Sequence, residues 1–397
     1  MNRKAWLLVL VGAALLVLRK PWALHTPQLW AEDGSIFLTQ DEQMGVHAWL
    51  EPYNGYLHLL PRLIAWTASH TADPAWWPAI YNGLAFALTV GVFIRIACAR
   101  VELPAKPGLA LALVLVVGSG ETLLNVTNLQ WVTAFFLVVH LFTRRPENTR
   151  ERLGDLAVLT VVGLNGPFAV LLLPFFARRA WREKHLDAWL ALAALGACAL
   201  TQATFLSRTS GLTLHEAAEP FHPLGLLATL GSRLVVWPFF GPAAVRNWPA
   251  WADALVGAVV IGGVLARAWR ADTDRPARTT IATLFVLITL ASVYRARADT
   301  WNHTDMANGD RYFFIPRVLL TWLVIWECRA QPRATAWLAR LAVGAALAWH
   351  APHFRLPAPP DYHWAQHCDP IRRGTPANIS TLPEGWWIEY PGRAAPP

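Results

Sequence analysis

Residues 76–98 read WWPAIYNGLAFALTVGVFIRIAC, an apolar run whose one charged residue, Arg95, lies near its end. A helix of this length crosses the ~30 Å hydrocarbon layer of a bilayer. Inside that layer each backbone polar group must find its partner within the protein, so helices and closed barrels are the structures that cross it. Since the run lacks the period-2 alternation of a barrel strand, it predicts a transmembrane helix.

Similar apolar runs recur along the chain and bring the prediction to about eleven spans. Besides 76–98 they are residues 5–18, 108–121, 128–143, 153–165, 167–177, 186–206, 250–268, 280–294, 312–328 and 335–350. The whole chain is 55% hydrophobic and only 15% charged, a balance that is rare in a water-soluble domain. We therefore expect an all-α, polytopic transmembrane bundle.

Positive charge is concentrated in alternate loops between these runs. Most of the 34 Lys and Arg lie at residues 3–4, 95–106, 144–152, 178–184, 267–278 and 329–340. The positive-inside rule places these segments in the cytoplasm, together with the N-terminus. Residues 19–75, 207–249 and 295–311 and the C-terminus are then extracytoplasmic. Because the net charge of +8 is spread over helix ends rather than gathered in one stripe, nucleic acid is not an expected partner.

Arginine far outnumbers lysine, which is typical of a GC-rich bacterial genome. For a bacterial protein with these apolar runs, we expect the inner membrane. Residues 1–350 form the expected membrane domain, and 351–397 form a Pro- and Trp-rich outer tail, expected to be a small irregular cap. Two alternatives stay open. Run 5–18 is a first span or a signal peptide without a clear cleavage site. Runs 153–165 and 167–177 are one kinked helix or two spans joined at Asn165-Gly166-Pro167.

The first outer loop carries an acidic pair, Glu32-Asp33, in the sequence WAEDG. Adjacent carboxylates at a low-dielectric boundary repel each other, so one of them acquires a raised pKa and can accept a proton near neutral pH. This is the property of a general base. The alternative is that the acids only solvate the loop or cap a helix that starts near Gly34.

Three arginines lie where a lipid phosphate would lie. Arg62 belongs to residues 57–68, too short to span and predicted as an interfacial helix, while Arg311 and Arg317 lie at the outer end of run 312–328. A guanidinium donates two parallel hydrogen bonds to a phosphate. The alternatives are a headgroup anchor for Arg62 and an ion pair of Arg317 with Asp310 or Asp33.

Four segments together resemble the GT-C superfamily, the polytopic glycosyltransferases that use polyprenyl-phosphate-linked sugars. They are WAEDG (30–34), YNGYLHLLPR (53–62), NLQW (128–131) and GDRYFFIPR (309–317), in a chain with a short first span and an acidic outer loop. The resemblance implies a transferase that moves a sugar from a polyprenyl-phosphate donor to an envelope glycan, lipid or protein on the extracytoplasmic face, with inversion.

The same resemblance implies the roles of the site residues. Asp33 is the expected base and Glu32 supports it. The leaving phosphate is assigned to Arg62, Arg311 and Arg317, and the substrate-lining residues are Asn54, His58, Asn128, Gln130 and Tyr312. We expect no cofactor and no metal, although some members of the superfamily use a divalent ion here. We also expect Asp33 and at least one of the three arginines to line one cavity open to the outer leaflet.

Two other functions compete with this one. A transporter or flippase of a lipid-linked glycan would use the same arginines for phosphate and the acids as a proton relay. It would distribute polar residues through the membrane midplane, whereas here they crowd at the outer ends of the runs. A non-catalytic envelope assembly subunit would tolerate Asp33→Asn. Polar residues such as Asn128, Gln130 and Arg233 are also explained by hydrogen bonds between helices.

Overall fold

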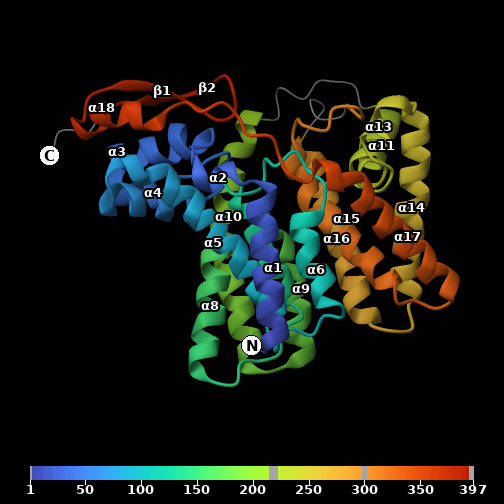
Figure 1. Cartoon of the computed structure of the whole chain (residues 1–397). Helices are drawn as coiled ribbons and strands as arrows, with labels where there is room; N and C mark the ends of the chain where they lie inside the picture. The colour runs from blue at the N-terminus through green and yellow to red at the C-terminus, as the bar shows by residue number, and fades with distance from the viewer. Residues whose placement is uncertain (1, 214–221, 297–301, 393–397) are drawn as a thin grey trace.

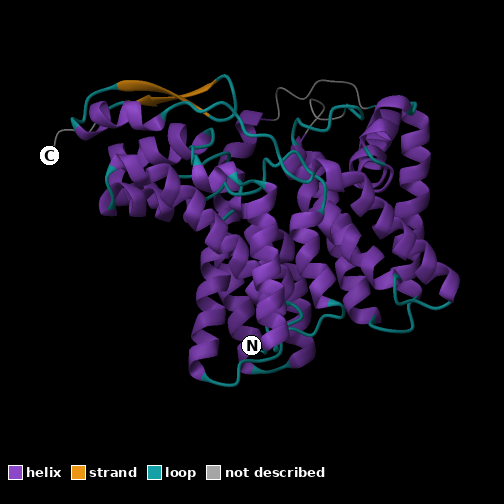
Figure 2. Cartoon of the chain, viewed as in Figure 1, coloured by secondary structure: helices purple, strands orange, loops and turns teal. Residues whose placement is uncertain are grey.

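The computed structural model describes residues 2–213, 222–296 and 302–392, and this part of the chain is mostly helical (Figure 1, Figure 2). The longer helices are α1 (Arg3–Arg19), α5 (Trp77–Ala97), α6 (Lys106–Leu115), α7 (Leu129–His140), α8 (Thr149–Gly163), α9 (Phe168–Glu183), α10 (Leu186–Thr213), α14 (Ala250–Arg270), α15 (Arg275–Ala296), α16 (Asp310–Glu327) and α17 (Arg333–His350). The expectation of a helical bundle is confirmed.

Short helices fill the loops of one end. They are α2 (Trp22–His25), the π-helical turn η1 (Asp33–Leu38), α3 (Thr39–Met44), η2 (Gly45–Leu50), α4 (Leu59–Thr71), η3 (Pro74–Trp76), α11 (Pro223–Gly231), η5 (Ser232–Val236), α12 (Trp237–Phe240), α13 (Pro242–Asn247), η7 (Ala351–His353), η8 (Trp364–His367) and α18 (Cys368–Arg372). The helix expected at residues 57–68 is α4, which lies with α3 on a shelf beside the bundle (Figure 1).

The bundle has two chemically different ends. At the one that we call the basic end, the N-terminus of α1 lies near the arginine-rich loops (Figure 1). The Glu102 N–H donates to the Phe142 carbonyl (2.7 Å), and Arg152 pairs with Asp187 (2.5 Å), so the segments predicted as cytoplasmic meet there. The opposite end, which we call the capped end, carries the first loop and the tail (Figure 1).

Five helical stretches are long and apolar enough to cross a membrane: Pro74–Ala97, Leu186–Arg208, Pro223–Phe240, Ala250–Arg270 and Arg275–Arg295. Four of them coincide with predicted spans. The remaining predicted runs form helices that are shorter or carry more charge, such as the apolar helices Lys106–Leu115 and Leu129–His140. The structure therefore supports a helical membrane protein with at least five helices of spanning length, and not the full count of eleven.

The stretch Pro223–Phe240 corrects the prediction, which treated 207–249 as an outside loop. Gly231 and Pro238 interrupt the apolar pattern, but the chain continues as helix from α11 through η5 to α12. Pro238 lies in the first turn of α12, directly after the π-helical turn η5, and proline is tolerated in the first turn of a helix.

Contacts place this stretch at the capped end. A Cβ on Gly231 would lie 2.0 Å from the Asp253 carbonyl oxygen near the start of α14, so only glycine permits this crossing. Farther along, the Trp237 carbonyl lies 3.0 Å from His350 Nε2 at the end of α17. Both contacts are with capped-end segments (Figure 1), so the stretch packs across that end of the bundle.

Residues 149–183 form two helices and not one kinked helix. The turn between α8 and α9 lies at the capped end, where Asn165 pairs with His58 in an isolated bridge. The other end of α9 lies at the basic end, where Arg179 donates to the His140 and Thr143 carbonyls. The two helices therefore run in opposite directions, and this removes the ambiguity that Asn165-Gly166-Pro167 left in the sequence.

The tail is more regular than expected, since β1 (Ala377–Thr381) and β2 (Trp386–Tyr390) form an antiparallel hairpin (Figure 2). Alternate residues face inward, and Ile379 pairs with Ile388 on the buried side. These isoleucines pack on Leu29, Phe37 and Ile64 in a second core, separate from the core of the bundle. The tail therefore covers the first loop.

Candidate active site

The WAEDG loop is held from two sides. On one side, the Leu382 N–H donates to the Leu29 carbonyl (3.2 Å), and the Ala31 N–H donates to the Leu382 carbonyl. On that same side, a Cβ on Gly34 would lie 2.1 Å from Ile388 Cδ1, so the hairpin approaches closer than any larger residue permits. The close fit of the tail explains the glycine of the motif.

On the other side, the Asp33 carboxylate binds the segment before α7. Oδ1 accepts hydrogen bonds from the Thr127 N–H (2.6 Å) and hydroxyl (2.6 Å), and Oδ2 accepts one from the Val126 N–H (3.2 Å). The residue has 0% exposed surface. Asp33 thus ties the first loop to residues 126–127, and its oxygens are engaged in doing so.

Burial raises the pKa of Asp33 to about 7, although the hydrogen bonds from Thr127 and Val126 oppose the shift. Lys20 lies within electrostatic range of this carboxylate. Its ammonium donates to the Leu123 carbonyl (2.6 Å) and lies 4.7 Å from the Trp22 ring. The expectation that Asp33 lines a cavity is wrong, because none of its surface is exposed.

Glu32 is the accessible member of the acidic pair. It is half-buried and accepts a hydrogen bond from the Tyr53 hydroxyl (3.2 Å). The guanidinium of Arg311 experiences the negative charges of both Glu32 and Glu121. Arg311 itself binds Glu121 through its backbone N–H (3.2 Å) and through Nη1. Glu32 therefore combines an open carboxylate with a nearby fixed cation.

A second buried carboxylate, Asp310, lies at the start of α16. Its Oδ1 accepts from Arg317 Nη2 (2.7 Å), and its Oδ2 accepts from the Ser119 N–H (2.7 Å) and hydroxyl (3.1 Å). Arg317 also donates from Nε to the Arg233 carbonyl (3.0 Å). Of the alternatives for Arg317, the structure contains the ion pair with Asp310, and both side chains are almost fully buried.

Two more buried arginines surround this pair. Arg19 and Arg233 both lie within electrostatic range of Asp310 and of Arg317. Each guanidinium lies over an aromatic ring: Arg19 is 5.5 Å from the Phe354 centroid and Arg233 is 4.7 Å from the Phe313 centroid. Three arginines thus surround Asp310, and Arg233 also lies within electrostatic range of Asp305 and Glu121. Within the described part of the chain, Nε of Arg19 and Nε and Nη1 of Arg233 have no hydrogen-bond acceptor.

A cleft of about 470 Å³ opens beside this cluster at the capped end. Arg19 and the exposed Arg246 line it, as do Gly118 and Trp237. Arg317 lies directly behind this wall, because a Cβ on Gly118 would be 3.4 Å from its Nη1 and because its guanidinium lies 5.0 Å from the Trp237 ring. The wall is therefore positively charged and can accept an anion.

The predicted substrate-lining residues at the start of α4 have structural roles. Asn54, at φ 51°, forms the tight turn between Tyr53 and Tyr56, and its carbonyl accepts from Arg295 (3.1 Å). His58 is buried and stacks on Tyr56 with ring centroids 4.6 Å apart. Burial lowers the pKa of His58 to about 3, so the imidazole is neutral.

The predicted residues near α7 fall into two groups. Asn128 fixes the loop before the helix by donating to the Glu121 carbonyl (2.9 Å). Gln130 donates to the Tyr56 hydroxyl (3.4 Å), and Tyr312 packs edge-on against Trp131 at 5.4 Å. Tyr312 lies next to Arg311, whose guanidinium is 5.1 Å from the centre of its ring, whereas Gln130 contacts the first loop and Asn128 contacts the loop before α7.

Arg62 does not join the other two arginines that were assigned to phosphate. It is buried, donates to the Glu51 carbonyl (3.1 Å) and lies 5.0 Å from the Phe37 ring. Asp41 lies within its electrostatic range. Arg62 therefore stabilises the shelf of α3 and α4, away from the cleft.

Four residues of the site escaped the sequence analysis: Arg19, Lys20, Glu121 and Arg246. The first two resemble the snorkelling end of a span, and their burial depends on carbonyls of residues 114 and 123. Among the described residues, no three His, Cys, Asp or Glu side chains come together as a metal site. Comparison of the chain with protein-family models, curated proteins and solved structures finds no match.

Proposed function

We propose that this protein is a membrane glycosyltransferase of GT-C type, which moves a sugar from a polyprenyl-phosphate donor to a cell-envelope acceptor. The observation that carries the proposal is the surplus of buried arginine around Asp310, beside a cleft at the capped end. A phosphate in that cleft would meet Arg19 and Arg246 directly and the field of Arg233 and Arg317 from behind. An apolar bundle beside it suits a polyprenyl chain.

The capped end is then the extracytoplasmic end in a bacterial inner membrane. The positive-inside rule supports this orientation, because the arginine-rich loops and the N-terminus share the opposite end (Figure 1). The short and charged helices would complete about eleven crossings, with α4 and the α11–α12 stretch lying at the outer surface.

In the proposed reaction, the acceptor hydroxyl attacks the anomeric carbon while a carboxylate removes its proton. The bond from that carbon to the phosphate oxygen breaks, and the polyprenyl phosphate leaves with the electron pair. Direct displacement inverts the anomeric centre. We assign the base to Glu32 and a positioning role to Asp33, the reverse of the sequence-based assignment, because Glu32 is accessible and the Asp33 oxygens are engaged.

The test is release of polyprenyl phosphate by purified protein in proteoliposomes supplied with polyprenyl-phosphate hexoses or pentoses and an envelope acceptor fraction. Loss of a general base lowers the rate by about 10²- to 10⁴-fold, so Glu32→Gln should fall in that range. Loss of one charge-assisted bond costs about 1.5–3 kcal/mol, so Arg246→Gln should raise KM about tenfold or more. Glu384→Gln and Arg373→Gln, exposed charges of the tail at the same end, are the controls and should match wild type.

Equal release by wild type and Glu32→Gln would remove Glu32 from the mechanism. If folded protein moved the lipid-linked sugar across the bilayer without releasing polyprenyl phosphate, the transporter or flippase would be the correct function. Absence of both activities would leave the assembly subunit.

A further inference from the structure

A second cleft, of about 670 Å³, opens at the basic end of the bundle, opposite the candidate active site. It lies between the end of α9, the start of α15 and the loop after α7. Its charged rim includes Arg144, Arg145, Arg178 and Arg182. The cleft is remote from the proposed transferase chemistry, and that chemistry leaves it without a role.

Arg179 has a structural role in this cleft, because its donors are used within the protein and are not available to a ligand. Its two terminal nitrogens donate to the His140 and Thr143 carbonyls, and its Nε donates to Glu183 (2.9 Å). These bonds hold the loop after α7 against the end of α9. As a result, Arg144 and Arg145 on the loop are brought beside the arginines of the helix.

The rim has more positive charge than its own acids neutralise. Glu183 binds Arg179, and Glu102 pairs with Arg144 at 3.5 Å, where both side chains are more than half exposed. The exposed Asp274 also lines the cleft, so five arginines lie among three acids. Within residues 2–213, 222–296 and 302–392, the exposed guanidinium groups of Arg145, Arg178 and Arg182 make no ion pair. Three guanidinium groups without an ion pair thus surround one opening, and each can donate hydrogen bonds to the oxygens of a phosphate.

The inner wall of the cleft is apolar. Leu141, Phe142 and Phe175 line it, and Ala277 completes it from α15. The next turn of α9 exposes Trp181, an indole of the kind that anchors helices at the headgroup level of a bilayer. A ligand for this cleft thus combines a phosphate with hydrocarbon.

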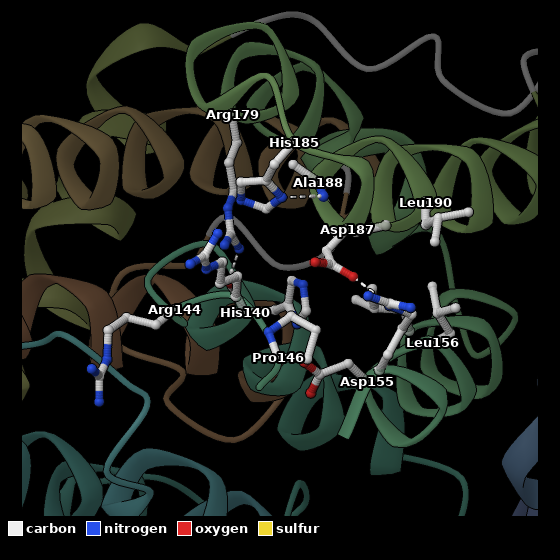
Figure 3. Close-up of a pocket in the computed structure, with 14 residues that line it drawn as sticks. His140, Arg144, Pro146, Asp155, Leu156, Arg179, His185, Asp187, Ala188 and Leu190 are labelled. Atoms are coloured by element: carbon white, nitrogen blue, oxygen red, sulfur yellow. Dashed lines mark hydrogen bonds and ion pairs between the residues drawn. The ribbon is translucent and has the colours of Figure 1, made fainter. Parts of the chain in front are cut away.

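A small cavity of about 20 Å³ adjoins the cleft and shares Arg144, Arg145, Arg179 and His185 with it (Figure 3). This volume holds about one water molecule. Asp187 at its edge pairs with Arg152. His185 Nδ1 accepts from the Ala188 N–H (3.1 Å), as Figure 3 shows. The small cavity is therefore too small to hold part of a ligand, and it does not enlarge the cleft.

We propose that this basic-end cleft binds the phosphate headgroup of an anionic phospholipid of the cytoplasmic leaflet. Basic pockets between helices on the cytoplasmic side are suited to such headgroups, because each nearby Lys or Arg attracts the anionic lipid. The inference is independent of the proposed transferase activity, because no residue of the cleft at the capped end takes part, while its assignment to the cytoplasmic leaflet rests on the orientation proposed above.

The test compares the thermal stability of the full-length protein in nanodiscs of phosphatidylcholine alone and with phosphatidylglycerol or cardiolipin added, and separately with inorganic phosphate. A cleft variant, Arg145→Gln with Arg178→Gln and Arg182→Gln, is matched by a control that removes three exposed arginines of the same end, Arg150→Gln with Arg329→Gln and Arg333→Gln. Native mass spectrometry counts the lipids retained by each protein.

Anionic lipid should stabilise wild type and the control equally, and the cleft variant should lose the stabilisation and the retained lipid. An equal loss in both triple variants would overturn the site, because general surface charge would then explain the effect. Stabilisation of wild type by inorganic phosphate alone, abolished in the cleft variant, would overturn the lipid source and assign the cleft to a soluble phosphate compound.

Discussion

Asp33 and Asp310 are both buried carboxylates at the capped end, but the protein satisfies them in opposite ways. Asp33 receives hydrogen bonds from uncharged groups, the N–H of Val126 and the N–H and hydroxyl of Thr127. Asp310 receives a charged guanidinium and has two further arginines within electrostatic range. The first arrangement joins two loops, and the second leaves positive charge to spare. A buried acid therefore indicates an anion-binding site only where the positive charges around it exceed its own negative charge.

The largest expected effect comes from removing the acid of the arginine cluster. Asp310→Ala leaves the buried Arg317 without its ion-pair partner and removes the acid nearest to Arg19 and Arg233, and breaking a buried pair in this way costs about 3–5 kcal/mol. Thermal unfolding in detergent should show a loss of that size. Asp272→Asn, an exposed acid of the basic end, should change stability by less than about 0.5 kcal/mol. A similar small loss for both would mean that the arginines are not held by Asp310.

The next largest expected effect is a pH dependence of stability that comes from Asp33. Because the folded pKa of Asp33 is raised from 3.8 to about 7, the folded state binds this proton more tightly than the unfolded state. Stability from this group is therefore fully present below about pH 4 and declines as the pH rises to about 7. At 1.36 kcal/mol per pKa unit, the decline amounts to at most about 4 kcal/mol.

Asp33→Asn removes that titration, so stability measured from pH 4 to 8 should lose this slope. The variant should also be less stable than wild type at pH 4, because its amide nitrogen faces N–H donors and leaves a buried group unsatisfied, at about 1–3 kcal/mol. Glu384→Gln, scanned in parallel, should keep the wild-type slope. Parallel slopes for wild type and Asp33→Asn would show that Asp33 is already ionised at pH 4.

The smallest effect concerns the contact that covers Asp33. Gly34→Ala places a methyl group against Ile388, and overpacking of this kind costs about 1–3 kcal/mol. Ile388→Ala removes the atoms that collide, so the double variant should be more stable than the sum of the two single changes predicts, by about 0.5–3 kcal/mol. Strict additivity would mean that the hairpin moves away from the loop freely.

The sequence alone predicts the helices well, because runs such as 76–98 carry their own apolar signal. It also identifies Arg311 and Arg317 as unusual, since a charge near the end of an apolar helix needs a partner. The stretch Pro223–Phe240 was missed because its glycine and proline resemble a loop until α14 is packed beside it.

The chemistry of the acidic pair was beyond prediction from local sequence. Whether Glu32 or Asp33 is accessible depends on donors at residues 126–127 and on a hairpin at residues 377–390, both far away along the chain. Lys20 and Arg19 likewise find their acceptors about a hundred residues later, at the Leu123 and Val114 carbonyls. Contacts between residues so far apart along the chain cannot be predicted from residue type and spacing.

The tail hairpin also constrains how the protein is made. The WAEDG loop emerges early in synthesis, but its cover over Gly34 arrives only after residues 377–390 have been synthesised, after all the helices of the bundle. During that interval the loop depends on other partners or on water. A nascent chain stalled before the hairpin would therefore present this loop to proteases, whereas the finished protein would shield it.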